Sequence, residues 1–237
     1  MKNESPLASK KQVEDFYNNF KEHQKKLGIN IRHRTILKNA KKAGLSQTMN
    51  VLEIGCGIGT VSHLLLQFID KGRFVGVDIS PESITQARKL NASFKNAEFV
   101  VSDMSDFKHE VKFDMVVLPD VLEHIPVEQH AHLFSVLKTH THNNSFVLIN
   151  IPEPNCLNWA RQHHPEKLQI IDQSLSMQDL LNNVYPNDFE LVSLQPYALQ
   201  YTQADYISIV LRRKNPKNNY QLKSKLILGK ENLLSKL

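Results

Sequence analysis

The sequence predicts an α/β domain with a doubly wound, mostly parallel sheet, and two patterns carry this prediction. Short apolar runs alternate along the chain with segments that have the 3.6-residue apolar period of helices. A glycine-rich turn separates the first apolar run, at 51–54, from a helical segment at 60–69. With 41% hydrophobic and 22% charged residues, the 237-residue chain is long enough for one such domain.

Two helices are expected before the first strand. One covers 11–27 and ends at Gly28, and the other covers 35–43, opened by 32–34 and closed by Gly44. They either cap the mouth of a ligand site or cover an edge of the sheet. The predicted division is a helical lead or cap (1–44), a main domain (45–214) and an amphipathic tail (215–237). Docking of the tail on the body is favoured over dimerisation or membrane contact.

Four further strands are expected at 73–79, 97–101, 113–118 and 145–151. Ser80 should cap the helix after the second strand, with Pro81 in its first turn. Helices are also expected at 120–125, 128–138 and 178–184. Two late strands, at 189–194 and 204–213, should pair antiparallel because their connection is too short for a helical crossover.

The glycine turn indicates a nucleotide-like ligand, since strand, glycine turn and helix together expose backbone N–H groups at a helix N-terminus. The spacing of Gly55, Gly57 and Gly59 is not the dinucleotide pattern G-x-G-x-x-G. Asp78, which closes the second strand, can accept two ribose hydroxyl groups. Asp103 with Met104 beside it suits an adenine ring and favours a methionine-derived cofactor over a dinucleotide.

With these motifs in this order, the stretch from 50 to 151 resembles the class I S-adenosylmethionine-dependent methyltransferases. The resemblance implies a Rossmann-like, seven-stranded sheet with one antiparallel strand, S-adenosyl-L-methionine as cofactor and S-adenosyl-L-homocysteine as product. It also implies cofactor contacts from Tyr17, Arg34, Glu53, Gly55, Cys56, Gly57, Gly59, Asp78, Ile79, Asp103, Met104, Leu118 and Pro119.

The segment 118–126 is most similar to small-molecule methyltransferases, including the ubiquinone-biosynthesis O-methyltransferases. An oxygen acceptor is therefore favoured over nitrogen. Asp120 stands where those enzymes usually have glutamate, and Pro119 replaces a larger residue, so the acceptor is not carried over.

Asp120, Glu123 and His124 are expected on one helix face, and His124 and Asp120 are the predicted catalytic residues. Three interpretations stay open. Glu123 and His124 are structural, or a carboxylate orients His124 as a general base, or the three side chains bind a divalent metal; no metal is predicted. The residues expected to face solvent are His130, His132, His140 and His142. Aromatic and basic residues expected on the acceptor side include Trp159, Arg161, His163, His164, Tyr185, Tyr197 and Tyr201.

Other functions remain as alternatives: a nucleic-acid or protein methyltransferase, an NAD-dependent oxidoreductase, and a non-catalytic cofactor-binding partner. The net charge of +5 comes from scattered lysines, and no basic stripe interleaved with aromatics appears, so no nucleic-acid partner is expected. No membrane span or signal peptide is recognised. Two cysteines without metal-type spacing indicate a reducing compartment. A cytoplasmic protein, with homodimerisation left open, is the expectation.

Overall fold

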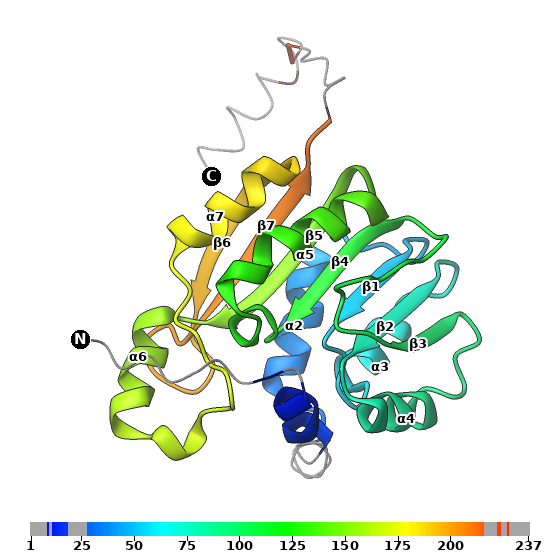
Figure 1. Ribbon diagram of the computed structural model, residues 1–237. Coiled ribbons are helices and arrows are strands. Elements are labelled where there is room, and N and C mark those ends of the chain that lie inside the picture. Colours follow the sequence, from blue (N-terminus) through cyan, green and yellow to red (C-terminus); the bar gives the residue numbers. More distant parts are fainter. Residues whose placement is uncertain (1–8, 10, 19–27, 216–221, 224–226, 228–237) are drawn as a thin grey trace.

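The computed structural model describes residues 9, 11–18, 28–215, 222–223 and 227, which form an α/β fold (Figure 1). Its sheet has seven strands in the order β3-β2-β1-β4-β5-β7-β6. The direction of winding reverses between β1 and β4, because the chain builds outward from β1 to β3 and then crosses to the other side of β1. The fold prediction, a doubly wound Rossmann-like sheet of seven strands, is confirmed.

All strands except β7 run parallel, and β7 is antiparallel to both of its neighbours, β5 and β6. The predicted antiparallel pair of late strands is therefore confirmed. The strands are β1 (Val51–Ile54), β2 (Phe74–Asp78), β3 (Ala97–Val101), β4 (Phe113–Pro119), β5 (Thr141–Pro152), β6 (Phe189–Tyr197) and β7 (Tyr206–Arg213).

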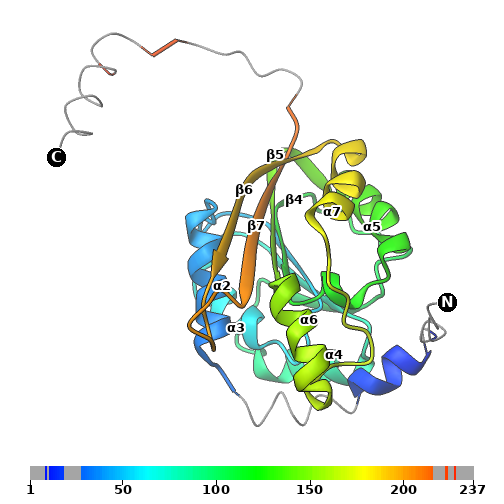
Figure 2. The same ribbon diagram turned by 90° about the vertical axis from the view of Figure 1, so that its left-hand side faces the viewer.

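Helices cover both faces of the sheet (Figure 2). The α-helices are α2 (Ile31–Lys42), α3 (Thr60–Leu66), α4 (Pro81–Leu90), α5 (Val127–His140), α6 (Pro154–His163) and α7 (Met177–Val184). Short 3-10 turns are η1 (Leu122–His124), η2 (Pro165–Lys167) and η3 (Tyr185–Asn187). Residues 11–18 are also helical.

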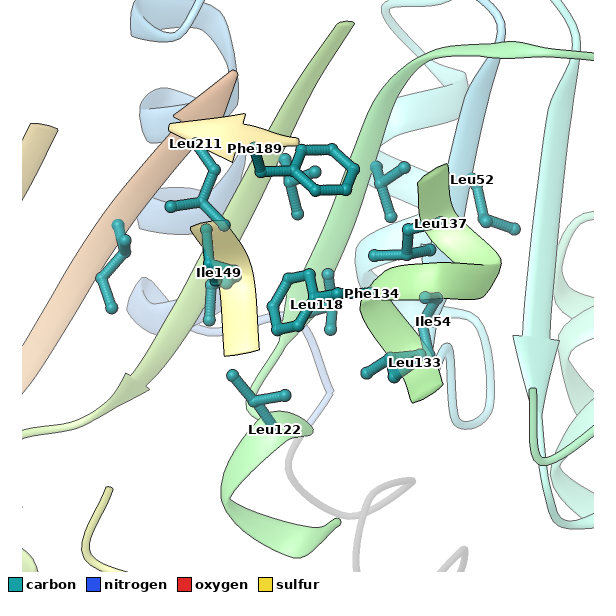
Figure 3. Close-up of a cluster of buried hydrophobic side chains, with 14 of the residues drawn as sticks. Leu52, Ile54, Leu118, Leu122, Leu133, Phe134, Leu137, Ile149, Phe189 and Leu211 are labelled. Carbon is teal, nitrogen blue, oxygen red and sulfur yellow. The ribbon is translucent and has the colours of Figure 1, made fainter. Parts of the chain in front are cut away.

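The two faces of the sheet carry separate apolar cores. Buried residues of α2, α3 and α4 pack on one face, and those of α5 and α7 pack on the other (Figure 3). Alternate residues of β1 divide between the cores, with Val51 in the first and Leu52 in the second. The central strands β1 and β4 are buried along nearly their whole length, as expected for parallel strands that are covered on both faces.

Several predicted elements differ from the structure. The second helix begins at Ile31 instead of Thr35, because the Asn30 side chain accepts from the backbone N–H groups of Arg32 and His33. The segment 154–163, for which no helix was expected, is α6: Glu153 caps it and Pro154 occupies its first turn.

The expected helix at 120–125 is only the 3-10 turn η1. Ile125 has extended dihedrals (φ −100°, ψ 126°), as a residue before proline prefers. The prediction that four histidines face solvent is wrong for two of them. His140 is buried, and His130 is buried while donating to the carbonyl oxygens of Leu122 and Ile125.

Some predictions fall outside the described residues. These are the 19–27 part of the first helix and, in the tail, residues 216–221, 224–226 and 228–237. The amphipathic tail stays a prediction.

Candidate active site

The glycine turn and the segment that follows β4 meet at the carboxyl edge of the sheet. Gly55, Gly57 and Gly59 all have positive φ, at 69°, 53° and 85°. A Cβ added to Gly55 would lie 2.2 Å from Cγ2 of Val121, so the first glycine of the turn lies against the chain just after Asp120. Sequence motifs 66 residues apart therefore share one site at the switch point of the sheet.

Asp78 at the end of β2 is tied to the glycine turn. Its Oδ2 accepts from the N–H of Gly57 at 2.8 Å, and its Oδ1 accepts from the N–H of Ser80 at 2.9 Å. Burial raises the pKa of this carboxyl, and the two backbone hydrogen bonds oppose the rise. Ser80 caps α4 by accepting from Ser83, as predicted.

Glu53 and Cys56 lie beneath the turn, inside the protein. Glu53 is fully buried, and Ser62 donates to its Oε2 at 2.5 Å. Burial raises the pKa of Glu53 to about 8, so this carboxyl holds its proton at neutral pH. Cys56 is buried in the core on the α3 side, and burial raises the pKa of its thiol. Both side chains are buried, and the cofactor contacts expected at these two positions stay a prediction.

The residues expected around an adenine ring follow β2 and β3. Ile79 is half-buried at the end of β2, and Asp103 accepts from the N–H and hydroxyl of Ser105. Met104 has φ +67°, but its side chain is 3% exposed and packs in the core. The Met104 side chain therefore belongs to the hydrophobic core at this end of the sheet.

Leu118 and Pro119 complete β4 and place Asp120 just beyond it. Both are buried, and Asp120 adopts φ +56°, which is uncommon for a residue other than glycine. The Asp120 carboxylate accepts from Asn150 Nδ2 at 3.1 Å and pairs with Nη1 of Arg32 at 3.0 Å. Burial raises the pKa of Asp120, and Arg32 opposes that rise most strongly.

Arg32, and not the predicted Arg34, faces the site. Residues that are two positions apart on an α-helix differ in direction by about 200°, so the side chains at 32 and 34 point in different directions. Arg34 is exposed, whereas Arg32 contacts Asp120 and the Tyr206 hydroxyl. Arg32 therefore contacts this edge of the sheet, and the cofactor contact expected of Arg34 stays a prediction.

His124 lies in η1 and is almost enclosed. Its Nδ1 is 2.5 Å from the carbonyl oxygen of Ile171 and 3.2 Å from Oδ1 of Asp172. Burial lowers its pKa, whereas Asp172 acts in the opposite direction. Glu123 is also buried, and its pKa is well above the usual range, chiefly because of that burial. Because η1 is a 3-10 turn and Asp120 precedes it with positive φ, the three side chains do not share an α-helical face.

The helical segment 11–18 covers the site. The rings of Tyr17 and His124 meet edge to face, with centroids 6.2 Å apart. The hydroxyl of Ser80 donates to the side-chain oxygen of Asn18 at 2.6 Å. The segment therefore touches both the β2 end and the β4 end of the site. Of the two alternatives for the N-terminal helices, this arrangement favours a cap over the ligand mouth.

Sequence reasoning missed three polar residues that lie near Asp120 or His124. Asn150 on β5 donates to Asp120 and accepts from the hydroxyl of Tyr197, and the rings of Tyr197 and Tyr206 are 5.8 Å apart. Tyr197 was expected on the acceptor side, whereas Asn150, Tyr206 and Asp172 were not singled out. Asn150 interrupts an apolar run of the sequence, and this was the available signal. In the structure its side chain is 1% exposed, so its polar atoms need partners inside the protein.

Other predicted acceptor-side aromatics gather on α6 and the β6–β7 connection. Trp159 stacks on His163 with centroids 4.7 Å apart and meets Tyr201 edge to face at 5.9 Å. Trp159 and Tyr201 remain 41% and 39% exposed, so ring surface stays open to a ligand. Tyr185 lies in η3, at the start of β6 and thus at the opposite edge of the sheet from its end at Tyr197.

This geometry agrees with the comparisons. A family model described as a methyltransferase domain matches residues 45–169, more than half of the chain. The chain belongs to the methyltransferase-domain family. The class I methyltransferase resemblance seen in the sequence is thereby confirmed at the level of the family.

Curated relatives match the methyltransferase domain over part of their length. Malonyl-[acyl-carrier protein] O-methyltransferase 1 of Ilyobacter polytropus is 28% identical over 96 residues, which are 40% of this chain and 36% of that protein. The chain spans about half or less of the length of the first such relatives.

Solved structures share the fold of the methyltransferase domain. Magnesium protoporphyrin IX methyltransferase from Synechocystis PCC 6803, with bound S-adenosylhomocysteine, gives a TM-score of 0.65 at 18% identity, over 86% of this chain and 99% of that one. The N-methyltransferase NodS from Bradyrhizobium japonicum, in complex with the same product, gives 0.64 at 17%, over 85% and 100%. These relatives are not named as ubiquinone-pathway enzymes, so the narrower resemblance stays a prediction.

The described residues contain neither a membrane-spanning helix nor a cluster of metal ligands. No helix among them is long and apolar enough to cross a membrane. Within the same ranges, no three His, Cys, Asp or Glu side chains come together as a set that could hold a metal ion. Asp120, Glu123 and His124 therefore do not form such a set of metal ligands in this arrangement.

Proposed function

We propose that this protein is an S-adenosylmethionine-dependent methyltransferase whose acceptor is a small molecule. The observation that carries the proposal is the hydrogen bond between Asp78 and the N–H of Gly57. It joins the acid at the end of β2 to a turn of three positive-φ glycines at the switch point of the sheet, where ligands of open α/β sheets bind.

The residues at this edge fit the cofactor. Each Asp78 oxygen accepts one backbone N–H, and a carboxylate oxygen has a second lone pair that a ribose hydroxyl can use. The glycines leave the backbone of the turn uncovered by Cβ atoms, so a ligand can approach it closely. Asp103 and Ile79 would lie toward the adenine, and Asp120 and His124 toward the acceptor.

The bound cofactor would supply an electrophilic methyl group on a sulfonium. The protein's part is to bind, orient and exclude water, and to take a proton where the acceptor needs it. His124 suits the proton-accepting role, because burial lowers its pKa and keeps its imidazole neutral. The segment 11–18 would keep water from the site through Tyr17 and Asn18.

Within this proposal we favour an oxygen acceptor over a nitrogen acceptor. The names of the relatives include both kinds of methyltransferase. One relative is named as an O-methyltransferase and another as an N-methyltransferase. A basic group beside the site favours an alcohol oxygen, because an alcohol must lose a proton, whereas an amine or an acidic phenol reacts with little proton chemistry. The resemblance of 118–126 to ubiquinone-biosynthesis enzymes is a further, narrower suggestion.

The three-part division is also proposed. Residues 1–44 act as lead and cap, 45–214 as the methyltransferase domain and 215–237 as the tail. A cytoplasmic location fits a chain with two free cysteines among its described residues.

Calorimetry and a transfer assay test the function. Wild-type protein should bind S-adenosylhomocysteine, and NADH should not bind. Labelled S-adenosylmethionine should then methylate a component of a small-molecule cell extract, which mass spectrometry identifies. Binding of NADH without S-adenosylhomocysteine would contradict the proposal. Label appearing only in added RNA or protein would contradict the small-molecule acceptor.

A further inference from the structure

The connection between η2 and α7 brings a carboxylate to His124. Oδ1 of Asp172 lies 3.2 Å from Nδ1 of His124, and the carbonyl oxygen of Ile171 lies 2.5 Å from the same nitrogen. A carbonyl oxygen only accepts, and an ionised carboxylate only accepts. The proton of the neutral imidazole therefore lies on Nδ1, and Nε2 carries the lone pair.

We propose that Asp172 positions His124 as the base that receives the proton of the methyl acceptor. The proposal rests on the methyltransferase function proposed above. In the transfer, Nε2 of His124 takes the proton from the acceptor atom as that atom bonds to the methyl carbon. The bond from sulfur to the methyl carbon breaks, and sulfur keeps its electron pair. The resulting imidazolium then faces the Asp172 carboxylate, which balances its charge.

Asp172 is itself held in place. Its Oδ2 accepts from the N–H of Gln169 at 2.5 Å, and its backbone carbonyl accepts from Arg161 at 2.7 Å. The next residue, Gln173, donates its N–H to the carbonyl of Glu123 at 3.0 Å. The connection is thereby fastened to η1 directly beside His124. A carboxylate whose side chain and backbone are both held by hydrogen bonds can set the orientation of an imidazole, whereas a mobile carboxylate cannot.

The other charged groups around His124 leave Asp172 as its main counter-charge. Glu123 Oε1 is 3.8 Å from Nε2, but burial raises the pKa of Glu123 well above its usual range and so disfavours its charged form. Asp120 favours the imidazolium less strongly than Asp172 does, and Arg32 disfavours it. Tyr17, which covers the ring, has a pKa raised by burial and is neutral.

Nitrogen-15 NMR of histidine-labelled protein, without cofactor, tests the pairing. The signals of His124 are those absent from a His124→Gln variant. Wild-type protein should show the Nδ1–H tautomer. Asp172→Asn should move the titration of His124 to lower pH, because the imidazolium loses its negative partner. Asp172→Glu keeps the negative charge, so His124 should titrate close to its wild-type pH in this variant. Asp179→Asn, at the exposed N-terminus of α7, is the matched control and should change nothing.

A rate measurement tests the catalytic consequence. In the extract assay at saturating cofactor, Asp172→Asn should lower the initial rate about tenfold or more, with S-adenosylhomocysteine affinity unchanged. An Nε2–H tautomer in the wild type, an unmoved titration in folded Asp172→Asn, or an unchanged rate would each overturn the proposal. Should Asp172→Asn fail to fold, the wild-type tautomer and Asp172→Glu still decide. Since the NMR needs no ligand, loss of the methyltransferase proposal would show separately, as absent cofactor binding.

Discussion

Arg32 of α2 and Asp120 beyond β4 form an ion pair, with Nη1 of the arginine 3.0 Å from Oδ2 of the aspartate. The pair connects α2, in the N-terminal lead, to the carboxyl edge of the sheet. It also compensates the charge of a carboxylate that burial disfavours and that accepts a hydrogen bond from Asn150. Arg32 thus links the predicted cap to a predicted catalytic residue.

Replacing Arg32 by alanine should destabilise the protein more than replacing Arg34. We expect a loss of about 1–3 kcal/mol in the free energy of unfolding, below the roughly 3–5 kcal/mol of a fully buried pair, because the Arg32 side chain is 32% exposed. Arg34→Ala, on the exposed side of α2, should stay within about 0.5 kcal/mol of wild type. Urea unfolding measures both, and equal losses would show that the ion pair contributes nothing particular.

The contact between Gly55 and Val121 gives a second prediction. Gly55→Ala combines a positive φ of 69° with a Cβ placed 2.2 Å from Val121 Cγ2, and should cost roughly 2–4 kcal/mol. Val121→Ala in the same chain should recover the part due to overlap. Gly44→Ala is the control for backbone strain alone, because its Cβ would meet nothing closer than 3.9 Å at φ 104°.

Denaturant unfolding of the single and double variants separates the two contributions. If Val121→Ala recovers none of the loss, the glycine is needed only for its dihedral angles, and the close approach of the two segments has no energetic role.

Features set by neighbouring residues could be predicted from the sequence. The strands 51–54 and 97–101 match exactly, because short apolar runs bounded by polar residues have few alternatives. Ser80 caps α4 through an N–H three residues away, which is also local. Pro154 shows the ambiguity of such signals, since it both follows a strand and occupies the first turn of α6.

Contacts between distant segments could not be predicted. The pairing of Asp172 with His124 depends on how the connection after α6 folds back over η1, and no spacing rule encodes it. The choice of Arg32 over Arg34 depends on the rotation of α2 about its axis, which its packing on the sheet determines. The positive φ of Asp120 likewise follows from tertiary contacts.

Asp78 gives a prediction on cofactor affinity. Asp78→Ala should weaken S-adenosylhomocysteine binding about 100-fold or more, because hydrogen bonds to a charged acceptor contribute roughly 1.5–3 kcal/mol each. Asp78→Asn keeps one oxygen acceptor and should lose less. Asp106→Ala, an exposed acid beyond β3, is the control.

Calorimetry measures these affinities, with thermal unfolding recorded alongside because Asp78 also holds the N–H groups of Gly57 and Ser80. An unchanged affinity in folded Asp78→Ala would remove the cofactor model.

Glu53 gives a prediction on pH. Its pKa of about 8 in the folded protein lies well above the 4.5 of an ordinary glutamate, so the native state binds more protons than the unfolded state between these values. Stability from this group is fully present below about pH 4.5 and is lost as the pH rises through about 8. Glu53→Gln cannot ionise, and its stability relative to wild type should therefore rise by a few kcal/mol across that window. Urea unfolding at pH 5 and pH 8 measures the difference, with Glu110→Gln, whose side chain is 86% exposed, as the matched control. A Glu53→Gln difference that is the same at both pH values would mean that Glu53 ionises normally in the folded protein.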